Sequence, residues 1–166
     1  IAIIPRAGGI TTPYIETGDI DEAHEKLGVY QEIFSEPGTW SENYSHQEVE
    51  IKLQAELTGI AALRLFTLAE TNEVIAFCWA QHLTPREITR AVLSVQYIQN
   101  ADCGINPEEI DHLTSGCAQA YLQDLGVKKA YRGRLNLEAL IYPVLDNVTR
   151  RAKTKSIFFW SIDATC

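Results

Sequence analysis

The chain has 166 residues, of which 46% are hydrophobic and 22% charged, and its formal net charge is −8. These values are ordinary for one globular domain, which we expect to span residues 1–166. No run approaches the about 20 apolar residues of a membrane-spanning helix, so we expect no membrane partner. The cysteines and histidines are scattered without metal-ligand spacing, which predicts no metal site and reduced thiols in a cytoplasmic protein.

The first half of the chain alternates short apolar runs with helical patterns. Ser45, followed three residues later by Glu48, indicates a capping box at the start of a helix. Two apolar runs about four residues apart predict a hairpin. In order, we expect a strand at Ile1–Ile4, a helix from Asp19 or Asp21 to about Phe34, a helix from Ser45 to Gly59, and strands at Ala62–Ala69 and Val74–His82.

The second half opens with another helix start. Thr84 has the character of an N-cap, Pro85 suits the first helical position and Glu87 completes a capping box. The apolar spacing carries this helix to Ile98, although its second half also suits a strand. Further on we expect a loop over Asn100–Gly116 with a short helical turn after Asn106-Pro107, a strand and a helix within Gln119–Leu145 and beyond, and a final strand over Lys155–Asp163.

The stretch Gln119–Leu145 combines a strand, a basic turn and the start of a helix. A basic turn opening a helix favours anion binding, because the first helical amides lack partners and the helix dipole attracts negative charge. Gly133 allows close backbone approach there. By itself the pattern is also typical of a purely structural turn.

Positive charge is concentrated in the same part of the chain. Residues 128–155 contain eight basic and two acidic residues, a net charge of +6, so the rest of the chain carries −14. A basic island in an acidic protein indicates a polyanionic ligand bound at one place.

The segment Tyr121–Arg134, YLQDLGVKKAYRGR, resembles the fourth strand and acetyl-CoA signature of the GCN5-related N-acetyltransferase (GNAT) superfamily. Three other segments are similar to the paired first helices, the second and third strands, and the fifth strand of that family: EIFSEPGTW with the helix from Ser45, LRLFTLAETNEVIAFCWAQH, and SIFFWSIDA. The resemblance implies an α/β (α+β) fold, with a central mixed, mostly antiparallel twisted sheet flanked by helices. It also implies that the chain lacks a C-terminal helix and two strands that the family usually adds.

The resemblance further implies acetyl-CoA as co-substrate. Arg132 and Gly133 fit the signature, whereas Leu135 and Leu137 stand where the family has small residues that let amides close around a pyrophosphate. Lys128 or Lys129 is the candidate for the ribose 3′-phosphate. The expected cofactor-binding residues are Leu125, Gly126, Val127, Arg132, Gly133, Arg134, Leu135, Asn136 and Leu137.

The catalytic candidates lie on the same predicted strand. Asp124 is the acid nearest the expected thioester, and Tyr121 stands where some relatives carry a catalytic acid. Strand alternation places Asp124 on the face opposite Tyr121, Gln123 and Leu125. Both side chains also suit purely structural roles. Trp40 and Tyr44 are candidates either for the acceptor pocket or for simple packing.

Two functional hypotheses on this fold follow. The first is an N-acetyltransferase that transfers acetyl from acetyl-CoA to a primary amine of a small molecule or peptide. The alternative is a non-catalytic module that binds acyl-CoA or a partner, which the Leu135 and Leu137 departures favour. Nucleic-acid binding by the basic helix is disfavoured by the net charge of −8 and by the lack of a recognisable motif. A homodimer is left open.

Overall fold

A five-stranded sheet forms the centre of the computed structural model, which describes residues 14–17, 28–37, 40–100 and 106–160. The strands lie in the order β1-β2-β3-β4-β5, antiparallel except for the parallel pair β4 and β5. The predicted mixed, mostly antiparallel sheet is therefore confirmed. The strands are β1 (Tyr14–Thr17), β2 (Ala61–Leu68), β3 (Val74–Leu83), β4 (Gln119–Val127) and β5 (Ile157–Phe158).

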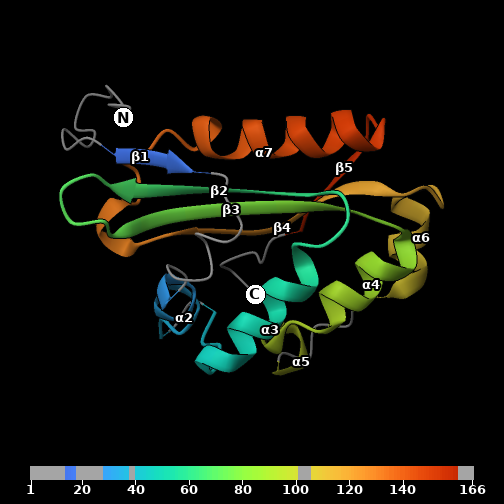
Figure 1. Ribbon diagram of the computed structural model, residues 1–166. Helices are drawn as coiled ribbons and strands as arrows, with labels where there is room; N and C mark the ends of the chain where they lie inside the picture. Colours follow the sequence, from blue (N-terminus) through green and yellow to red (C-terminus); the bar gives the residue numbers. More distant parts are fainter. Residues whose placement is uncertain (1–13, 18–27, 38–39, 101–105, 161–166) are drawn as a thin grey trace.

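Helices cover both faces of this sheet (Figure 1). Helix α7 (Leu137–Ala152) lies along one face, where it contacts β2, β3 and β4. The other α-helices that the structure describes lie on the side of the opposite face. These are α2 (Gly28–Phe34), α3 (His46–Glu56), α4 (Pro85–Leu93), α5 (Gln96–Asn100) and α6 (Pro107–Leu113), and a 3₁₀ turn, η1 (Lys129–Tyr131), follows β4.

Both predicted capping boxes are present. The Ser45 and Thr84 side chains accept hydrogen bonds from the amides of Glu48 and Glu87, whose carboxylates accept bonds from the two N-cap amides in return. The hydrogen bonds from Ser45 and Thr84 lower the pKa of the respective glutamates. The starts of α3 and α4 are thus determined by residues that are close together in the sequence.

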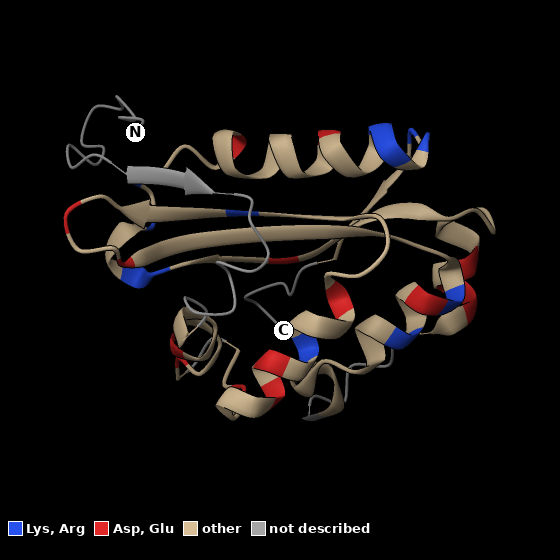
Figure 2. Ribbon diagram, viewed as in Figure 1, with Lys and Arg blue, Asp and Glu red and all other residues tan. Residues whose placement is uncertain are grey.

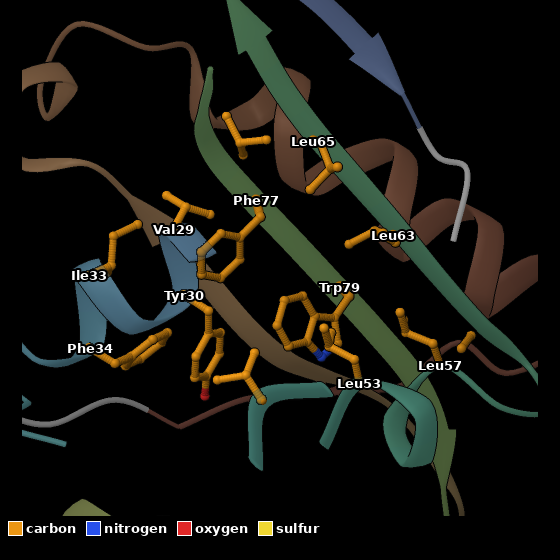
Figure 3. Close-up of a cluster of buried hydrophobic side chains, with 13 residues drawn as sticks. Val29, Tyr30, Ile33, Phe34, Leu53, Leu57, Leu63, Leu65, Phe77 and Trp79 are labelled. Carbon is orange, nitrogen blue, oxygen red and sulfur yellow. The ribbon is translucent and has the colours of Figure 1, made fainter. Parts of the chain in front are cut away.

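Two cores lie on opposite faces of the sheet. The aromatic core lies between the sheet and helices α2 and α3, where the Tyr30 ring is 5.7 Å from the rings of both Phe77 and Trp79 (Figure 3). The aliphatic core under α7 includes Leu135, Leu140 and small strand residues such as Ala76. Most of the large buried aromatic side chains therefore lie on the α2–α3 face, where Tyr30 and Phe34 contribute to the wall of a cleft, whereas Phe66 is buried under α7.

Several predicted elements differ from the observed ones. The strand β1 occupies a segment where the sequence indicated none, whereas the strand predicted at residues 1–4 lies outside the described residues, as does the first part of the helix predicted to end at Phe34. The helix predicted through Ile98 ends at Leu93, and the segment suited to a strand forms α5 instead. Ser94 is the C-cap of α4, and beyond it the chain bonds to a distant segment: the amide of Gln96 donates to the Tyr44 hydroxyl at 3.3 Å and its side chain accepts from the amide of Asn43 at 2.9 Å.

Candidate active site

Strands β4 and β5 diverge soon after they meet. They pair at Ala120 with Ile157 and at Tyr121 with Phe158, and a cavity of about 590 Å³ opens beside the rest of β4. Its wall is mostly apolar and aromatic. The lining residues are Tyr30, Phe34, Trp40, Glu42, Val95, Leu122, Gln123, Asp124, Leu125, Ile141, Leu145, Ile157, Phe159 and Trp160.

A β-bulge determines which β4 side chains face this cavity from the α3 side. Trp79 pairs with Asp124 and the next residue, Ala80, pairs with Leu122, so Gln123 is an extra residue in β4. Gln123 accepts a hydrogen bond from the Gln81 side chain at 2.9 Å, while Asp124 contacts α3.

The prediction from strict alternation is therefore wrong. Asp124 lies on the same side of the sheet as Tyr121 and Gln123, and Leu125 instead packs into the core under α7. Alternation failed because a bulge adds one residue and reverses the side-chain phase of the strand beyond it.

Asp124 belongs to a buried cluster of charges. Nζ of Lys52 lies 3.1 Å from Oδ2 of Asp124 and forms a second ion pair with Glu56, four residues along α3. Nε1 of Trp79 donates a hydrogen bond to Glu56 at 3.0 Å. The Lys52, Glu56 and Asp124 side chains are only 13–14% exposed. Water therefore screens these charges poorly, and their mutual interactions are strong.

The cluster shifts the pKa of each member. Burial raises the pKa of Glu56 to about 7, although the attraction of Lys52 opposes this shift. Burial also raises the pKa of Asp124, against the opposing effects of Lys52 and a hydrogen bond from Tyr30. For Lys52, burial alone would lower the pKa, but the two carboxylates outweigh it and the pKa is raised. Lys52 is thus charged, and the carboxylates hold protons more tightly than they would in water.

Tyr121 lies deeper than Asp124. Its hydroxyl accepts a hydrogen bond from Nε1 of Trp160 at 2.8 Å, and burial raises its pKa. Among the described residues, the cavity is lined by Trp160 rather than by Tyr121. Tyr121 therefore supports the wall of the cavity at this position.

The segment between α2 and α3 forms a further part of the wall. Trp40 lies edge-on to Trp160, with ring centroids 6.1 Å apart, and contacts Phe34 at 5.5 Å. Glu42 is buried and lines the cavity, with its amide bonded to the carbonyl of Phe34 at 2.8 Å. Burial raises the pKa of Tyr44 to about 12. Trp40 thus packs against neighbouring aromatic rings and also lines the large cavity, while its part in an acceptor pocket stays a prediction.

A second, smaller cavity of about 240 Å³ lies at the start of α7. It is formed by the turn in which the sequence predicted phosphate binding. Gly133 has φ +72°, a left-handed conformation that favours glycine, and nothing lies within 4 Å of where its Cβ would be. Asn136 caps α7 by accepting a hydrogen bond from the amide of Glu138 at 3.2 Å. The lining residues are Val127, Tyr131, Arg132, Gly133, Leu135, Asn136, Leu137 and Glu138.

The two leucines of the turn differ in environment. The Leu135 side chain is 3% exposed and packs in the core under α7. Leu137, the first residue of α7, is 40% exposed at the rim of the small cavity. Of these two leucines, therefore, only Leu137 has its side chain on the open side of the turn.

The basic residues of this turn already have acidic partners. Arg132 donates to both oxygens of Glu36 at 2.7 and 2.9 Å, and its Nε donates to the carbonyl of Val127 at 3.0 Å. Lys128 forms ion pairs with Glu32 at 2.8 Å and Glu73 at 2.7 Å. The positive charge counted along the sequence is thus partly neutralised in space. Arg134 and Lys129, by contrast, are exposed.

The basic cluster at the end of α7 is remote from this turn (Figure 2). One of its members, Arg151, donates to the carbonyl of Ala61 at 2.9 Å and to the side chain of Asn147 at 3.2 Å. Arg150 lies 3.7 Å from Asp146. These arginines are therefore partly engaged within the fold.

Lys52 and Glu56 are site residues that the sequence did not identify. Their only local signal is their spacing of four residues, which is equally typical of an exposed helical ion pair. Their burial depends on contact with β3 and β4, which lie far away in the sequence.

Comparisons with known proteins agree with this architecture. An acetyltransferase of Trypanosoma brucei matches with a TM-score of 0.55 at 12% identity, covering 92% of this chain and 86% of that one. A GNAT family acetyltransferase of Staphylococcus aureus matches with a TM-score of 0.54 at 10% identity, covering 90% and 87%. No family model and no curated protein sequence matches the chain. The fold is GNAT-like, as the sequence resemblance implied.

None of the described helices combines the length and apolar character needed to cross a membrane.

Proposed function

We propose that the protein is an N-acetyltransferase that uses acetyl-CoA and acts on a primary amine of a small molecule or peptide. The observation that carries the proposal is the position of Asp124, a buried carboxylate on the cavity that opens where β4 and β5 diverge. A carboxylate at this place can take a proton from an ammonium group before the nitrogen attacks. The GNAT-like fold supports the proposal.

The residues at the turn after β4 fit the proposed co-substrate. The left-handed Gly133 leaves space beside the backbone, and α7 directs its positive dipole end at the small cavity. Leu135 does not obstruct this cradle, since its side chain is buried under α7. Arg132 would hold the pyrophosphate once it has released the carboxylate of Glu36. The edge of β4 over Leu125, Gly126 and Val127 would pair with the pantetheine amides.

The roles of the chain's own groups follow from charge and burial. Asp124 accepts the ammonium proton, while Glu42 adds negative charge to the cavity and Trp40 and Trp160 bound it with aromatic faces. When bound, acetyl-CoA supplies a thioester whose carbon–sulfur bond breaks as the amine nitrogen takes the acetyl group, and the released thiolate takes up the second proton that this nitrogen loses. Among the described residues Tyr121 is not part of the cavity lining, and its hydroxyl accepts the indole N–H of Trp160, so we assign Tyr121 to holding Trp160 in the cavity wall.

A second candidate function is a non-catalytic module that binds acyl-CoA or a partner protein. The pairing of Arg132 with Glu36 favours the partner-binding form of this module, because an arginine that keeps this acidic partner contributes little to phosphate binding. The cytoplasmic location and the homodimer stay predictions.

Calorimetry and kinetics separate these functions. We expect titration with acetyl-CoA or CoA to give micromolar binding, and amine-dependent release of free thiol to detect turnover over a panel of amines. Asp124→Asn should bind CoA like the native protein and lose at least about 100-fold in turnover. Binding without turnover over the whole panel would support the non-catalytic module. No heat with either nucleotide would contradict the acetyltransferase and the acyl-CoA-binding module alike.

A further inference from the structure

The cavity-facing carboxylate of Asp124 is one end of a buried row of three charges. The ammonium group of Lys52 lies between the carboxylates of Asp124 and Glu56, and the far oxygen of Glu56 accepts the indole hydrogen bond of Trp79. Of the two acids, Asp124 lines the large cavity and Glu56 lies behind Lys52. Two carboxylates therefore share one cation in a place from which water is largely excluded.

Such a row does not hold two negative charges easily. With both acids ionised it carries a net charge of −1, and burial penalises that charge. One added proton makes the row neutral. The pKa of Glu56, raised by burial to about 7, and the raised pKa of Asp124 agree with a proton that is shared near neutral pH.

The groups around the row come from several elements. Tyr30 of α2 lowers the pKa of Asp124, against the larger effect of burial, and its ring centroid lies 5.8 Å from Nζ of Lys52. Glu42 and Tyr44 face the cluster from the segment between α2 and α3. Tyr121 of β4 interacts with all three charges. Of these neighbours, Glu42 is a further buried acid on the cavity wall.

We propose that Lys52, Glu56 and Asp124 form one proton-accepting unit, in which Lys52 and Glu56 are positioning residues that set the basicity of Asp124. The inference rests on the proposed function, because the proton is that of the acceptor ammonium. In this step the N–H bond of the ammonium breaks, an O–H bond forms on Asp124, and the unit passes from a net charge of −1 to zero. A cationic acceptor stabilises the ionised unit before the transfer and leaves as a neutral amide.

A first test does not depend on activity. Because the Trp79 indole donates to Glu56, its N–H resonance should titrate as the proton on the row is lost. The resonance is assigned by its absence from the spectrum of Trp79→Phe. In the native protein we expect its chemical shift to change with pH, with a titration midpoint within about one unit of pH 7. In Glu56→Gln, which keeps an oxygen acceptor but cannot ionise, the midpoint should disappear or fall by about one unit or more.

The second test is the pH dependence of kcat/KM. Removing the second carboxylate lets Lys52 stabilise ionised Asp124 alone, so the acid limb should move down by about one pH unit in Glu56→Gln. Loss of the cation should move it up by a similar amount in Lys52→Met, and Lys52→Arg should restore it. Glu50→Gln, at an exposed position of α3, is the matched control and should leave the profile unchanged.

The outcomes of these tests distinguish the shared proton-accepting unit from the proposed acetyltransferase function. Two results would overturn the shared unit without contradicting the acetyltransferase function. One is turnover by folded Glu56→Gln with the acid limb of its kcat/KM profile unmoved. The other is a Trp79 resonance that does not titrate in the native protein. A Trp79 titration that Glu56→Gln abolishes, in a protein that acetylates no amine, would support the shared proton and overturn the proposed function. Should Lys52→Met not fold, Glu56→Gln decides by itself.

Discussion

The Arg132 guanidinium donates two hydrogen bonds, at 2.7 and 2.9 Å, to the carboxylate of Glu36, a residue 96 positions earlier in the chain. Glu36 follows α2, at the start of the segment that forms one wall of the large cavity, whereas Arg132 lies in the proposed phosphate turn. The two halves of the candidate site are thus connected by one bidentate ion pair. A phosphate group would compete with Glu36 for the same two donors.

Glu36→Gln is expected to strengthen CoA binding. The amide cannot hold Arg132 as an ion pair, so the guanidinium becomes available to the pyrophosphate at a lower cost. An ion pair of this exposure contributes up to about 1 kcal/mol, which predicts an affinity gain of about three- to fivefold by calorimetry. Glu109→Gln, which makes the same change of charge on the exposed side of α6, is the control. Equal affinities for the native protein and Glu36→Gln would show that Arg132 does not contact the nucleotide.

The two leucines of the turn are expected to respond in opposite ways. Leu135→Ala removes a buried core side chain and should lower the free energy of unfolding by about 2–5 kcal/mol, with CoA affinity of the folded protein unchanged. Leu137→Ala should change stability by less than about 1 kcal/mol and tighten CoA binding, because it clears the rim of the cradle. Urea denaturation and calorimetry measure both quantities. Weaker binding in Leu137→Ala would mean that this side chain contacts the ligand favourably.

Gly126→Ala is expected to destabilise the sheet. A Cβ on Gly126 would lie 2.3–2.8 Å from three ring atoms of Phe77, the residue of β3 that pairs with Gly126 of β4. Phe77 is fully buried and packs against the rings of Tyr30, Phe34 and Trp79, so we expect a loss of about 1–3 kcal/mol in urea denaturation. The double variant Gly126→Ala with Phe77→Leu tests the cause, because the smaller side chain should recover part of the loss. Additive losses in the double variant would point to another origin.

The stability of the protein should depend on pH through Glu56. Its pKa is about 7 in the folded state and near the ordinary value of 4.5 in the unfolded chain. Because the folded state binds this proton more tightly, the contribution is fully present below pH 4.5 and is lost as pH rises through 7. The free energy of unfolding should therefore fall by on the order of 2–3 kcal/mol between about pH 4.5 and pH 8.

Glu56→Gln isolates this contribution. Groups remote from the buried row, including the capping glutamates, largely cancel in the difference between the two stability profiles, so this difference reports the coupled titration of Glu56 and Asp124. The variant should lose most of the downward slope that the native protein shows over this range. Parallel profiles would place the titration on another residue.

The sequence predicted the elements whose signals are local. The Ser45–Glu48 and Thr84–Glu87 boxes, the β2–β3 hairpin and the start of α7 each depend on residues a few positions apart. The break after α4 was missed because the apolar spacing continues through it, while the bonds of Gln96 to Tyr44 and Asn43 join segments far apart in the sequence.

The chemistry of the candidate site depends on contacts between distant segments. The sequence identified Asp124 and the turn at Arg132, but not Lys52, Glu56 or the Glu36 partner. Counting charge along the chain overstated the positive field at the turn, because its neutralising acids come from α2, the segment after it and the hairpin. The direction of the Leu135 side chain likewise depends on how α7 packs on the sheet.

The extra residue at Gln123 also bears on how such a site changes over evolutionary time. Deleting Gln123 would leave Leu122 and Asp124 opposite Ala80 and Trp79, so the Asp124 side chain would stay on the same face as Tyr121, beside Lys52. A slip of β4 by one residue against β3 would instead turn Asp124 toward the aliphatic core under α7, although no residue has changed. A lineage could therefore lose the extra residue and keep the acid in place, whereas a change of strand register would remove the site without any substitution.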